Sequence, residues 1–334
     1  MDLQRTFRNR IEVSEMTTME TTFTRNPGYL DLLGSGVLKD RVQLACQHLE
    51  QCDLCARYCR VNRLKTTEGA ICQTGEQALV YSFGAHYGEE EPISGWMGSG
   101  AIFFGRCNLH CVFCQNWEIS QTGAGRFATP DQIALIMLAL QKRGCHNINL
   151  VSPSHVVAQI VSATLIAAQH GLHIPLVYNT GGYDSLEALQ LLDGIIDIYM
   201  PDMKYGSSTA SRRLSGVSDY PDINRAAVWE MHRQVGDLEL DSHGLAVRGL
   251  LVRHLVLPGD LAGSNEVLDF IAKDISPLTY VNLMDQYYPW YRAEDFAPLD
   301  RSILRGEYRR VLDMADRHGL RRVDEHRERR RLGI

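Results

Sequence analysis

The chain lacks long hydrophobic runs, a leader-like segment and a strong excess of charge of one sign. No apolar stretch among its 334 residues approaches the roughly 20 residues that span a bilayer. Residues 1–25 are polar and contain no apolar segment of the kind found in signal peptides. The formal net charge is −6, which argues against a dedicated nucleic-acid-binding protein. We therefore expect a cytoplasmic protein with no membrane or nucleic-acid partner.

The nine cysteines are unevenly distributed, which makes a disulfide framework a poor explanation in a reducing compartment. Seven of them form two tight groups: Cys52, Cys55, Cys59 and Cys72, and then Cys107, Cys111 and Cys114. The remaining two, Cys46 and Cys145, lie in apolar helical contexts and are predicted to be core residues. Thiolates grouped this closely are typical of metal sites.

Short apolar segments alternate with helical patterns through most of the chain. Strands are predicted at 100–105, 147–151, 174–179, 195–200, 245–257 and 280–284. Helices are predicted at 37–49, 130–143, 154–170, 185–192, 220–235 and 264–272. This alternation indicates an α/β fold with a parallel sheet, either a doubly wound open sheet or an incomplete barrel. In both cases ligands bind at the C-terminal ends of the strands.

Three segments are expected along the chain. Residues 1–75 form an N-terminal arm and a cysteine-rich, metal-binding appendage, and 76–299 form the main α/β domain. Residues 300–334 form a C-terminal helix and a basic tail. The basic run at 317–331 is interpreted as a solvated helix end rather than a phosphate-binding patch.

The most specific motif is GRCNLHCVFCQN at 105–116, directly after the first strand of the main domain. Its three thiolates suit an iron–sulfur cluster with one iron left open, the condition that catalysis at a metal requires. Phe113 precedes the third cysteine and is placed to shield the cluster. A zinc knuckle that uses His110 is the alternative, but zinc motifs favour CxxC pairs with a fourth ligand.

At these residues the sequence resembles the radical S-adenosylmethionine (SAM) superfamily, which carries CxxxCxxC after its first strand with an aromatic residue before the last cysteine. The resemblance covers about 95–290 and is most like the branch related to pyruvate formate-lyase activating enzymes, in particular its PflX-like subgroup. It implies a partial (β/α)6 TIM-type barrel and a 4Fe–4S cluster on Cys107, Cys111 and Cys114. It also implies reductive cleavage of SAM to methionine and a 5′-deoxyadenosyl radical, with flavodoxin or ferredoxin as electron donor.

The resemblance extends to three strand ends. Asp202-Met203-Lys204 matches an Asp-x-Lys of the activating enzymes, which makes Lys204 a partner for the methionine carboxylate rather than part of a surface salt bridge. Arg253, in VRHLVLPG, either contacts the carboxylate or ribose or flanks the core. Gln286 and Tyr287, in NLMDQYYP, either face adenine or substrate or serve in aromatic packing.

The chain departs from the family pattern after its second strand. The usual Gly-Gly-Glu stretch, whose backbone holds the methionine amino group, is replaced by SPSH at 152–155. The backbone at Ser152 is expected to serve instead, since carbonyl acceptors need no particular side chain. A Gly-Gly pair, Gly181-Gly182, occurs after the third strand. His155 is interpreted as a helix N-terminal residue, with a catalytic or orienting role as the alternative.

The N-terminal group, CDLCARYCRVNR…GAIC, supplies four thiolates, enough for structural zinc or an auxiliary iron–sulfur cluster. Activating enzymes with extra clusters carry those cysteines after the first motif, whereas these precede it, which puts activation of a glycyl radical partner in doubt.

Three functions stay open: hydrogen abstraction from a glycine of a protein or peptide, radical modification of a small molecule or another peptide residue, and non-catalytic electron transfer or zinc-stabilised binding. A carrier needs neither a barrel nor an open iron.

Overall fold

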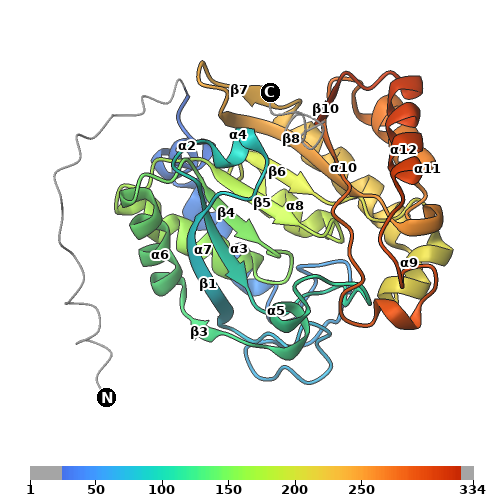
Figure 1. Cartoon of the computed structure of the whole chain (residues 1–334). Helices are drawn as coiled ribbons and strands as arrows, with labels where there is room; N and C mark the ends of the chain where they lie inside the picture. Colours follow the sequence, from blue (N-terminus) through green and yellow to red (C-terminus); the bar gives the residue numbers. More distant parts are fainter. Residues whose placement is uncertain (1–24, 325–334) are drawn as a thin grey trace, which may run out of the picture.

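The computed structural model describes residues 25–324, and one ten-stranded sheet organises them (Figure 1). Its order is β10-β9-β8-β6-β5-β4-β2-β1-β3, with β7 paired to β8 outside this path. Seven strands are parallel to their neighbours: β2 (Ser99–Phe104), β4 (Ile148–Val151), β5 (Leu176–Thr180), β6 (Ile198–Pro201), β8 (Ala246–Leu255), β9 (Tyr280–Met284) and β10 (Arg322–Asp324).

The strand order identifies the architecture as barrel-type. The parallel strands follow one another in space in the order in which they occur in the chain, from β2 to β10. A doubly wound sheet reverses its strand order at a switch point, and the described strands contain no such reversal. The predicted partial TIM-type barrel is confirmed, and all six predicted strands are present. The seventh, β10, was not predicted, because its three residues follow a helix too closely to give a periodic signal.

Three strands run antiparallel to their neighbours: β1 (Ala78–His86), β3 (Arg126–Ala128) and β7 (Glu239–Leu240). Sequence analysis missed β1, because its second half is solvent-exposed and gives no continuous apolar run. Tyr81 and Phe83 are among its exposed side chains. The strand β7 pairs with β8 across the turn at 241–244 and forms a hairpin.

The helices connect the strands and cover the outside of the sheet. In chain order they are α2 (Gly28–Ser35), α3 (Val37–Gln47), α4 (Glu91–Ser94), α5 (Trp117–Thr122), α6 (Pro130–Lys142), α7 (Val157–Gln169), α8 (Leu186–Leu192), α9 (Ser208–Ser215), α10 (Tyr220–Val235), α11 (Ser264–Phe270) and α12 (Arg305–His318). A π-helical turn, Ile271–Ile275, extends α11, and 3-10 turns lie at Pro258–Asp260 and Ala293–Asp295. Thr129 and Gln132 form a capping box that starts α6, as the Thr-Pro signal predicted.

The N-terminal residues pack onto this domain. Helices α2 and α3 contact α7, and the largest apolar cluster runs without interruption from Tyr29 and Leu38 to the inner faces of α6 and α7. Figure 1 shows α6 and α7 on one side of the strands and α11 and α12 on the other. No helix within 25–324 is long and apolar enough to cross a membrane. Most of the arm and the last part of the basic tail lie outside the described residues.

Candidate active site

The cysteine loop begins where β2 ends and folds back over the C-terminal ends of the strands. Two of its residues, Arg106 and His110, adopt the left-handed conformation, with φ of 72° and 61°. Val112 N donates to Leu214 O at 2.9 Å, which ties the loop to α9. The sharp turns of this loop let three cysteines within eight residues line the same cavity.

Each sulfur of the loop has a polar neighbour. Ser215 Oγ donates to Cys111 Sγ at 3.0 Å, and the backbone N–H two residues after Cys107 lies 3.4 Å from its sulfur. Cys114 Sγ and Ser120 Oγ are 3.2 Å apart. Donors placed on sulfur stabilise thiolates and tune the potentials of iron–sulfur clusters. The donor set therefore fits a thiolate-bound cluster.

The three sulfurs also affect one another electrostatically. Burial, and then repulsion from Cys111, raises the pKa of Cys107 to about 12, and the same two causes raise the pKa of Cys114. Within residues 25–324, no three His, Cys, Asp or Glu side chains are grouped as a single metal ion requires. A 4Fe–4S cluster makes a different demand, because each thiolate binds its own iron atom.

The loop opens onto a cavity of about 710 Å³ at the C-terminal ends of the parallel strands. The three loop cysteines line it, together with the five residues predicted to bind the cofactor: Phe113, Ser152, Asp202, Lys204 and Arg253. The structure thus brings together residues from the ends of four different strands. A cavity of this size suits a small-molecule ligand.

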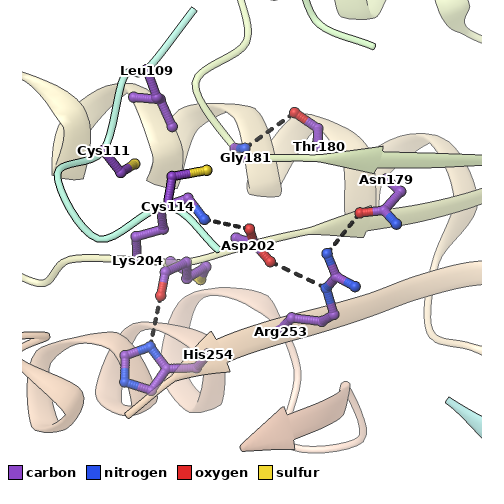
Figure 2. A network of polar contacts seen from close by, with 12 residues as sticks. Leu109, Cys111, Cys114, Asn179, Thr180, Gly181, Asp202, Lys204, Arg253 and His254 are labelled. Carbon is purple, nitrogen blue, oxygen red and sulfur yellow. Dashed lines mark hydrogen bonds and ion pairs between the residues drawn. The ribbon is translucent and has the colours of Figure 1, made fainter. Parts of the chain in front are cut away.

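A buried ion-pair network crosses the cavity wall (Figure 2). Asp202 accepts hydrogen bonds from Lys204 Nζ and from Arg253 Nε, the latter at 3.1 Å. Arg253 also donates to Asn179 Oδ1 at 2.7 Å and to Glu89 Oε2 at 3.2 Å. Burial alone would raise the pKa of Asp202, but Lys204 and Arg253 outweigh it and lower that pKa. Asp202 is therefore ionised and holds both cations in place.

Backbone contacts fix the turns that carry this network. His254 Nδ1 lies 2.6 Å from Met203 O, which joins β8 to the turn between Asp202 and Lys204 (Figure 2). Tyr220 Oη donates to Gly181 O at 2.9 Å and accepts from Lys204 N at 3.0 Å. The ends of β5, β6 and β8 are thus linked through side chains that do not themselves line the cavity.

The Gly181-Gly182 turn is packed too tightly for side chains. A Cβ at Gly182 would lie 2.2 Å from Asn224 Nδ2, and the residue has a φ of +75°. A Cβ at Gly181 would lie 2.9 Å from Leu109 Cδ1. Asn108 Nδ2 donates to the backbone oxygen of the next residue, Tyr183, at 2.7 Å. This turn therefore contacts the cysteine loop and supports it.

The residues of the SPSH stretch are placed differently from one another. Ser152 has a φ of +59°, donates its N–H to Asn179 O at 2.9 Å and lines the cavity. His155 is buried, sits before the start of α7 and does not line the cavity. Its Nε2 lies 3.0 Å from Gly105 O, and burial lowers its pKa to about 3, so the ring is neutral. It contacts the base of the cysteine loop.

The aromatic residues at the strand ends form one wall. The Phe113 ring packs edge-on against Tyr205 and Tyr287, with centroids 6.3 and 6.1 Å apart. Tyr287 is buried, and its hydroxyl donates to Leu299 O at 2.7 Å. Tyr287 and Gln286 both line the cavity. The packing role predicted as one alternative for Tyr287 is therefore present, on a residue that also faces the cavity.

Comparison with known proteins gives the family. Residues 101–236 match the sequence profile of the radical SAM superfamily. Uncharacterized protein MJ0674 of Methanocaldococcus jannaschii is 30% identical over 299 residues, which cover 87% of this chain and 82% of its relative. The chain belongs to the radical SAM superfamily. Membership implies an enzyme that uses a 4Fe–4S cluster and SAM, while a relative that is itself uncharacterised carries no information on substrate.

The second cysteine group of this radical SAM protein lies outside the matched range and outside the cavity lining. Cys52, Cys55 and Cys72 are buried and Cys59 is half-buried. Burial raises the pKa of Cys55 to about 12, with the other three sulfurs contributing repulsion. The four sulfurs are thus electrostatic neighbours, but within residues 25–324 no three of them are grouped as a single metal ion requires, and the metal site expected here stays a prediction.

Two arginines connect this segment to the rest of the site. Arg57 donates to the backbone oxygens of Asn108 (2.6 Å) and Leu109 (3.3 Å), inside the first cysteine loop. Arg63 is only 2% exposed and donates to Cys52 Sγ at 3.5 Å and to His155 O at 2.8 Å. The cysteine-rich segment therefore packs directly against the loop of the radical SAM domain.

Sequence reasoning missed the polar residues at the other end of the cavity. Glu89 and Glu90 follow β1, the strand that was not predicted, so nothing placed them near the site. Glu89 pairs with Arg253 and accepts from Asn149 Nδ2 at 3.1 Å, while Glu90 accepts from Asn282 Nδ2 at 2.6 Å. The only available signal was the polarity of GEEE between two apolar runs.

Proposed function

We propose that Cys107, Cys111 and Cys114 hold the 4Fe–4S cluster and that SAM lies in the adjoining cavity. The observation that carries this proposal is that three cysteines and the Asp202–Lys204 pair, distant in sequence, line one cavity at the C-terminal ends of the strands. The donor set supports a cluster with one iron open to a ligand. When bound, the cluster supplies the electron that cleaves SAM to methionine and a 5′-deoxyadenosyl radical.

The protein's own residues bind and orient in this proposal. Lys204 is assigned to the methionine carboxylate, with Asp202 and Arg253 fixing its position. The backbone around Ser152 is assigned to the methionine amino group. Gly181 keeps space free beside Leu109, and the buried Phe113 excludes water from the cluster side of the cavity. Each assignment uses a side chain or backbone group that the fold already holds in place.

The substrate class is inferred more coarsely. The Asp-x-Lys turn and the VRHLVLPG strand favour the branch related to pyruvate formate-lyase activating enzymes and its PflX-like subgroup. We infer hydrogen abstraction from a substrate, activase-like in character, with reduction by flavodoxin or ferredoxin. Radical modification of a small molecule or peptide is the second candidate, favoured because the extra cysteines precede the first motif. A non-catalytic carrier ranks last, since an open cavity beside three thiols serves no carrier function.

The second cysteine group is proposed as a metal site within a 1–75 appendage, ahead of the 76–299 barrel and the 300–334 tail. Cys52, Cys55, Cys59 and Cys72 supply thiolates for zinc or an auxiliary iron–sulfur cluster. The buried Arg63 supports anionic sulfur here. Within residues 25–324 its side chain donates to three backbone oxygens, of Thr74, Gly75 and His155, and to one thiol, and none of these partners is a carboxylate. A buried cation is stable only beside compensating charge or hydrogen bonds.

The decisive experiment uses anaerobically reconstituted full-length protein. We expect wild type to form 5′-deoxyadenosine from SAM and dithionite, and the Cys111→Ala variant to form none. Cys145→Ala is the matched control, because Cys145 is buried away from the cavity. Continued product formation by Cys111→Ala, or none by wild type with iron and sulfide incorporated, would refute the proposal.

A further inference from the structure

One carboxylate oxygen in the cavity has no partner. Glu90 is 4% exposed and lines the cavity. Its Oε1 accepts from Asn282 Nδ2 at 2.6 Å, but its Oε2 is buried without a hydrogen bond. An ionisable oxygen removed from water without a partner costs free energy. This oxygen is therefore an acceptor available to a ligand.

The backbone places Glu90 on the inner side of the curved sheet. The segment that carries Glu89 and Glu90 joins β1 to α4, and its side chains reach three strands: Asn149 on β4, Arg253 on β8 and Asn282 on β9. Figure 1 shows α4 at the end of the strands opposite α5, which follows the cysteine loop. Glu90 and the cysteines thus belong to different parts of one cavity.

Charge in the cavity is unbalanced toward the negative. Five acidic side chains line it, of which Asp285 and Asp324 have partners of their own, so the balance is drawn over Glu89, Glu90 and Asp202. Two permanent cations, Lys204 and Arg253, also line it, and both are engaged by Asp202, with Glu89 on the other side of Arg253. Among the ion pairs of residues 25–324, none gives Glu90 a cation within salt-bridge distance.

A second orphan acceptor lies beside this carboxylate pair. Asn149 is fully buried, and its Nδ2 donates to Glu89 Oε1, which leaves its Oδ1 without a partner. The orphan groups in this region are thus both oxygens. Asn149 does not line the cavity, so the acceptor that a ligand can meet is Glu90 Oε2. An unpartnered carboxylate oxygen calls for a ligand that brings positive charge and N–H donors.

We propose that the substrate of this enzyme carries an ammonium or guanidinium group that binds Glu90 Oε2 inside the barrel. This inference rests on the proposed function, because it makes the acidic end of the cavity the substrate subsite and the cysteine end the cofactor subsite. Asn282 holds the carboxylate in position. Arg253 attracts Glu90 electrostatically, but its hydrogen bonds go to Asp202, Glu89 and Asn179, which leaves Oε2 of Glu90 without a donor.

Calorimetric titration of the anaerobic holoprotein, with the non-cleavable S-adenosylhomocysteine present, tests the inference. The probes are n-butylammonium, n-butylguanidinium and n-butanol, the neutral isostere of the ammonium. We expect one or both cations to bind about tenfold or more tightly than the alcohol, from the strength of a charged hydrogen bond. The two cationic probes distinguish an ammonium from a guanidinium substrate.

Variants identify the residue responsible. Glu90→Gln keeps the Asn282 contact and the side-chain shape but removes the charge, so it should abolish the preference for the cation. Glu91→Gln is the control, since Glu91 is exposed and does not line the cavity. Equal binding of alcohol and cation, no binding of either cation, or unchanged cation binding in Glu90→Gln overturns the inference.

Two parallel measurements separate the alternatives. Weaker S-adenosylhomocysteine binding by Glu90→Gln, with cation binding intact, would assign the orphan oxygen to the cofactor and overturn the inference. 5′-Deoxyadenosine formation by wild type without any amine reports on the proposed function alone. Failure of that reaction refutes the proposed function. Loss of cation selectivity with the reaction intact refutes only the inference that the substrate is cationic.

Discussion

The two cysteine groups of this protein differ in what surrounds their sulfurs. The loop at 107–114 presents three cysteines to a cavity, and its sulfurs have polar neighbours in Ser215 and Ser120. The group at 52–72 has four cysteines, lies away from that cavity and packs around the buried Arg63. The group of three cysteines therefore lines this cavity, and the group of four cysteines does not.

The proposed metal sites at the two groups would be of two kinds on one scaffold. Three thiolates beside a cavity leave a coordination position open to a small molecule, as catalysis requires. Four thiolates enclosed by protein complete their own coordination, as structural or relay sites do. The comparison predicts that substitutions in the two groups have separable effects on SAM cleavage and on metal content.

The largest expected effect comes from alanine substitution in each group. Cys107→Ala should reduce 5′-deoxyadenosine formation by more than about 100-fold. Loss of an outer-shell partner of a metal site already costs up to about 100-fold, and the proposed role of Cys107 is that of a direct ligand. Cys55→Ala should lower the metal content per chain while SAM cleavage by the remaining cluster persists. Quantification of product together with iron and zinc analysis measures both outcomes.

The Cys46→Ala variant serves as control, because Cys46 is exposed and outside both groups. Equal loss of SAM cleavage in Cys107→Ala and Cys55→Ala would contradict the separation of the two sites. It would instead make the N-terminal group an obligatory part of the catalytic centre.

A smaller effect is expected from the buried arginine of the N-terminal group. Arg63→Met removes four hydrogen bonds of a buried cation, three to backbone oxygens and one to Cys52 Sγ. We expect the free energy of unfolding to fall by about 3 kcal/mol, the value of one strong charged hydrogen bond, after partial relaxation. Urea denaturation of the anaerobic holoprotein measures this loss, and metal analysis should show a depleted second site.

Arg60→Met is the matched control, since Arg60 is exposed, forms an ion pair with Asp53 at 2.8 Å and lies over the Tyr58 ring. Its loss should cost about 0.5 kcal/mol, as for surface ion pairs generally. Equal stability and equal metal content in both variants would show that Arg63 does not compensate thiolate charge.

The first cysteine loop was predictable from local chemistry, whereas the barrel and the roles of the strand-end residues followed from the family resemblance, since periodicity left two closures of the sheet open. The C-x3-C-x2-C spacing after an apolar strand placed the loop at the correct strand end, and the Asp202–Lys204 spacing placed that pair in the same cavity. Periodicity located most of the longer helices, and α10 spans Tyr220–Val235 as predicted, but it missed the short helices α2, α4, α5 and α9. Such features need only a few neighbouring residues and the rule that ligands bind at strand C-termini.

The acidic end of the cavity was not predictable, for a physical reason. Glu89 and Glu90 acquire their role from contacts with Asn149, Arg253 and Asn282, which are 60 to 192 positions away in the chain. They also follow β1, whose exposed face breaks the apolar pattern that reveals buried strands. The pairing of β1 with β2 is formed in the folded chain and is not visible in the local sequence pattern. The positions of the residues that follow β1 therefore could not be predicted either.

The Gly181-Gly182 turn, which supports the first cysteine loop, provides a further test of this comparison. Gly182→Ala places a Cβ 2.2 Å from Asn224 Nδ2 at a φ of +75°, whereas Gly216→Ala has a similar φ of +69° and open space around it. We expect Gly216→Ala to cost about 1 kcal/mol from the left-handed backbone alone and Gly182→Ala about 2 kcal/mol more from the clash. Thermal denaturation and S-adenosylhomocysteine titration measure the two variants side by side.

Only Gly182→Ala should also weaken cofactor binding, because Asn108 in the first loop donates to Tyr183 O beside this glycine. Metal content of the N-terminal group should stay unchanged in both variants. A loss of cofactor binding that is the same in both would mean that the turn contributes to stability without positioning the loop.

The smallest effect is expected where the two cysteine segments meet. Arg57→Met removes the hydrogen bonds to the backbone oxygens of Asn108 and Leu109, at a cost of about 1.5 kcal/mol for one net charged bond. Since those oxygens belong to the first loop and Arg57 to the second segment, the substitution should perturb the EPR signal of the first cluster without removing iron from either site. Arg212→Met, at an exposed arginine nearby, should leave that signal unchanged. An unaltered signal in Arg57→Met would mean that the two segments touch without influencing each other, and the 52–72 group would then serve the fold rather than the reaction.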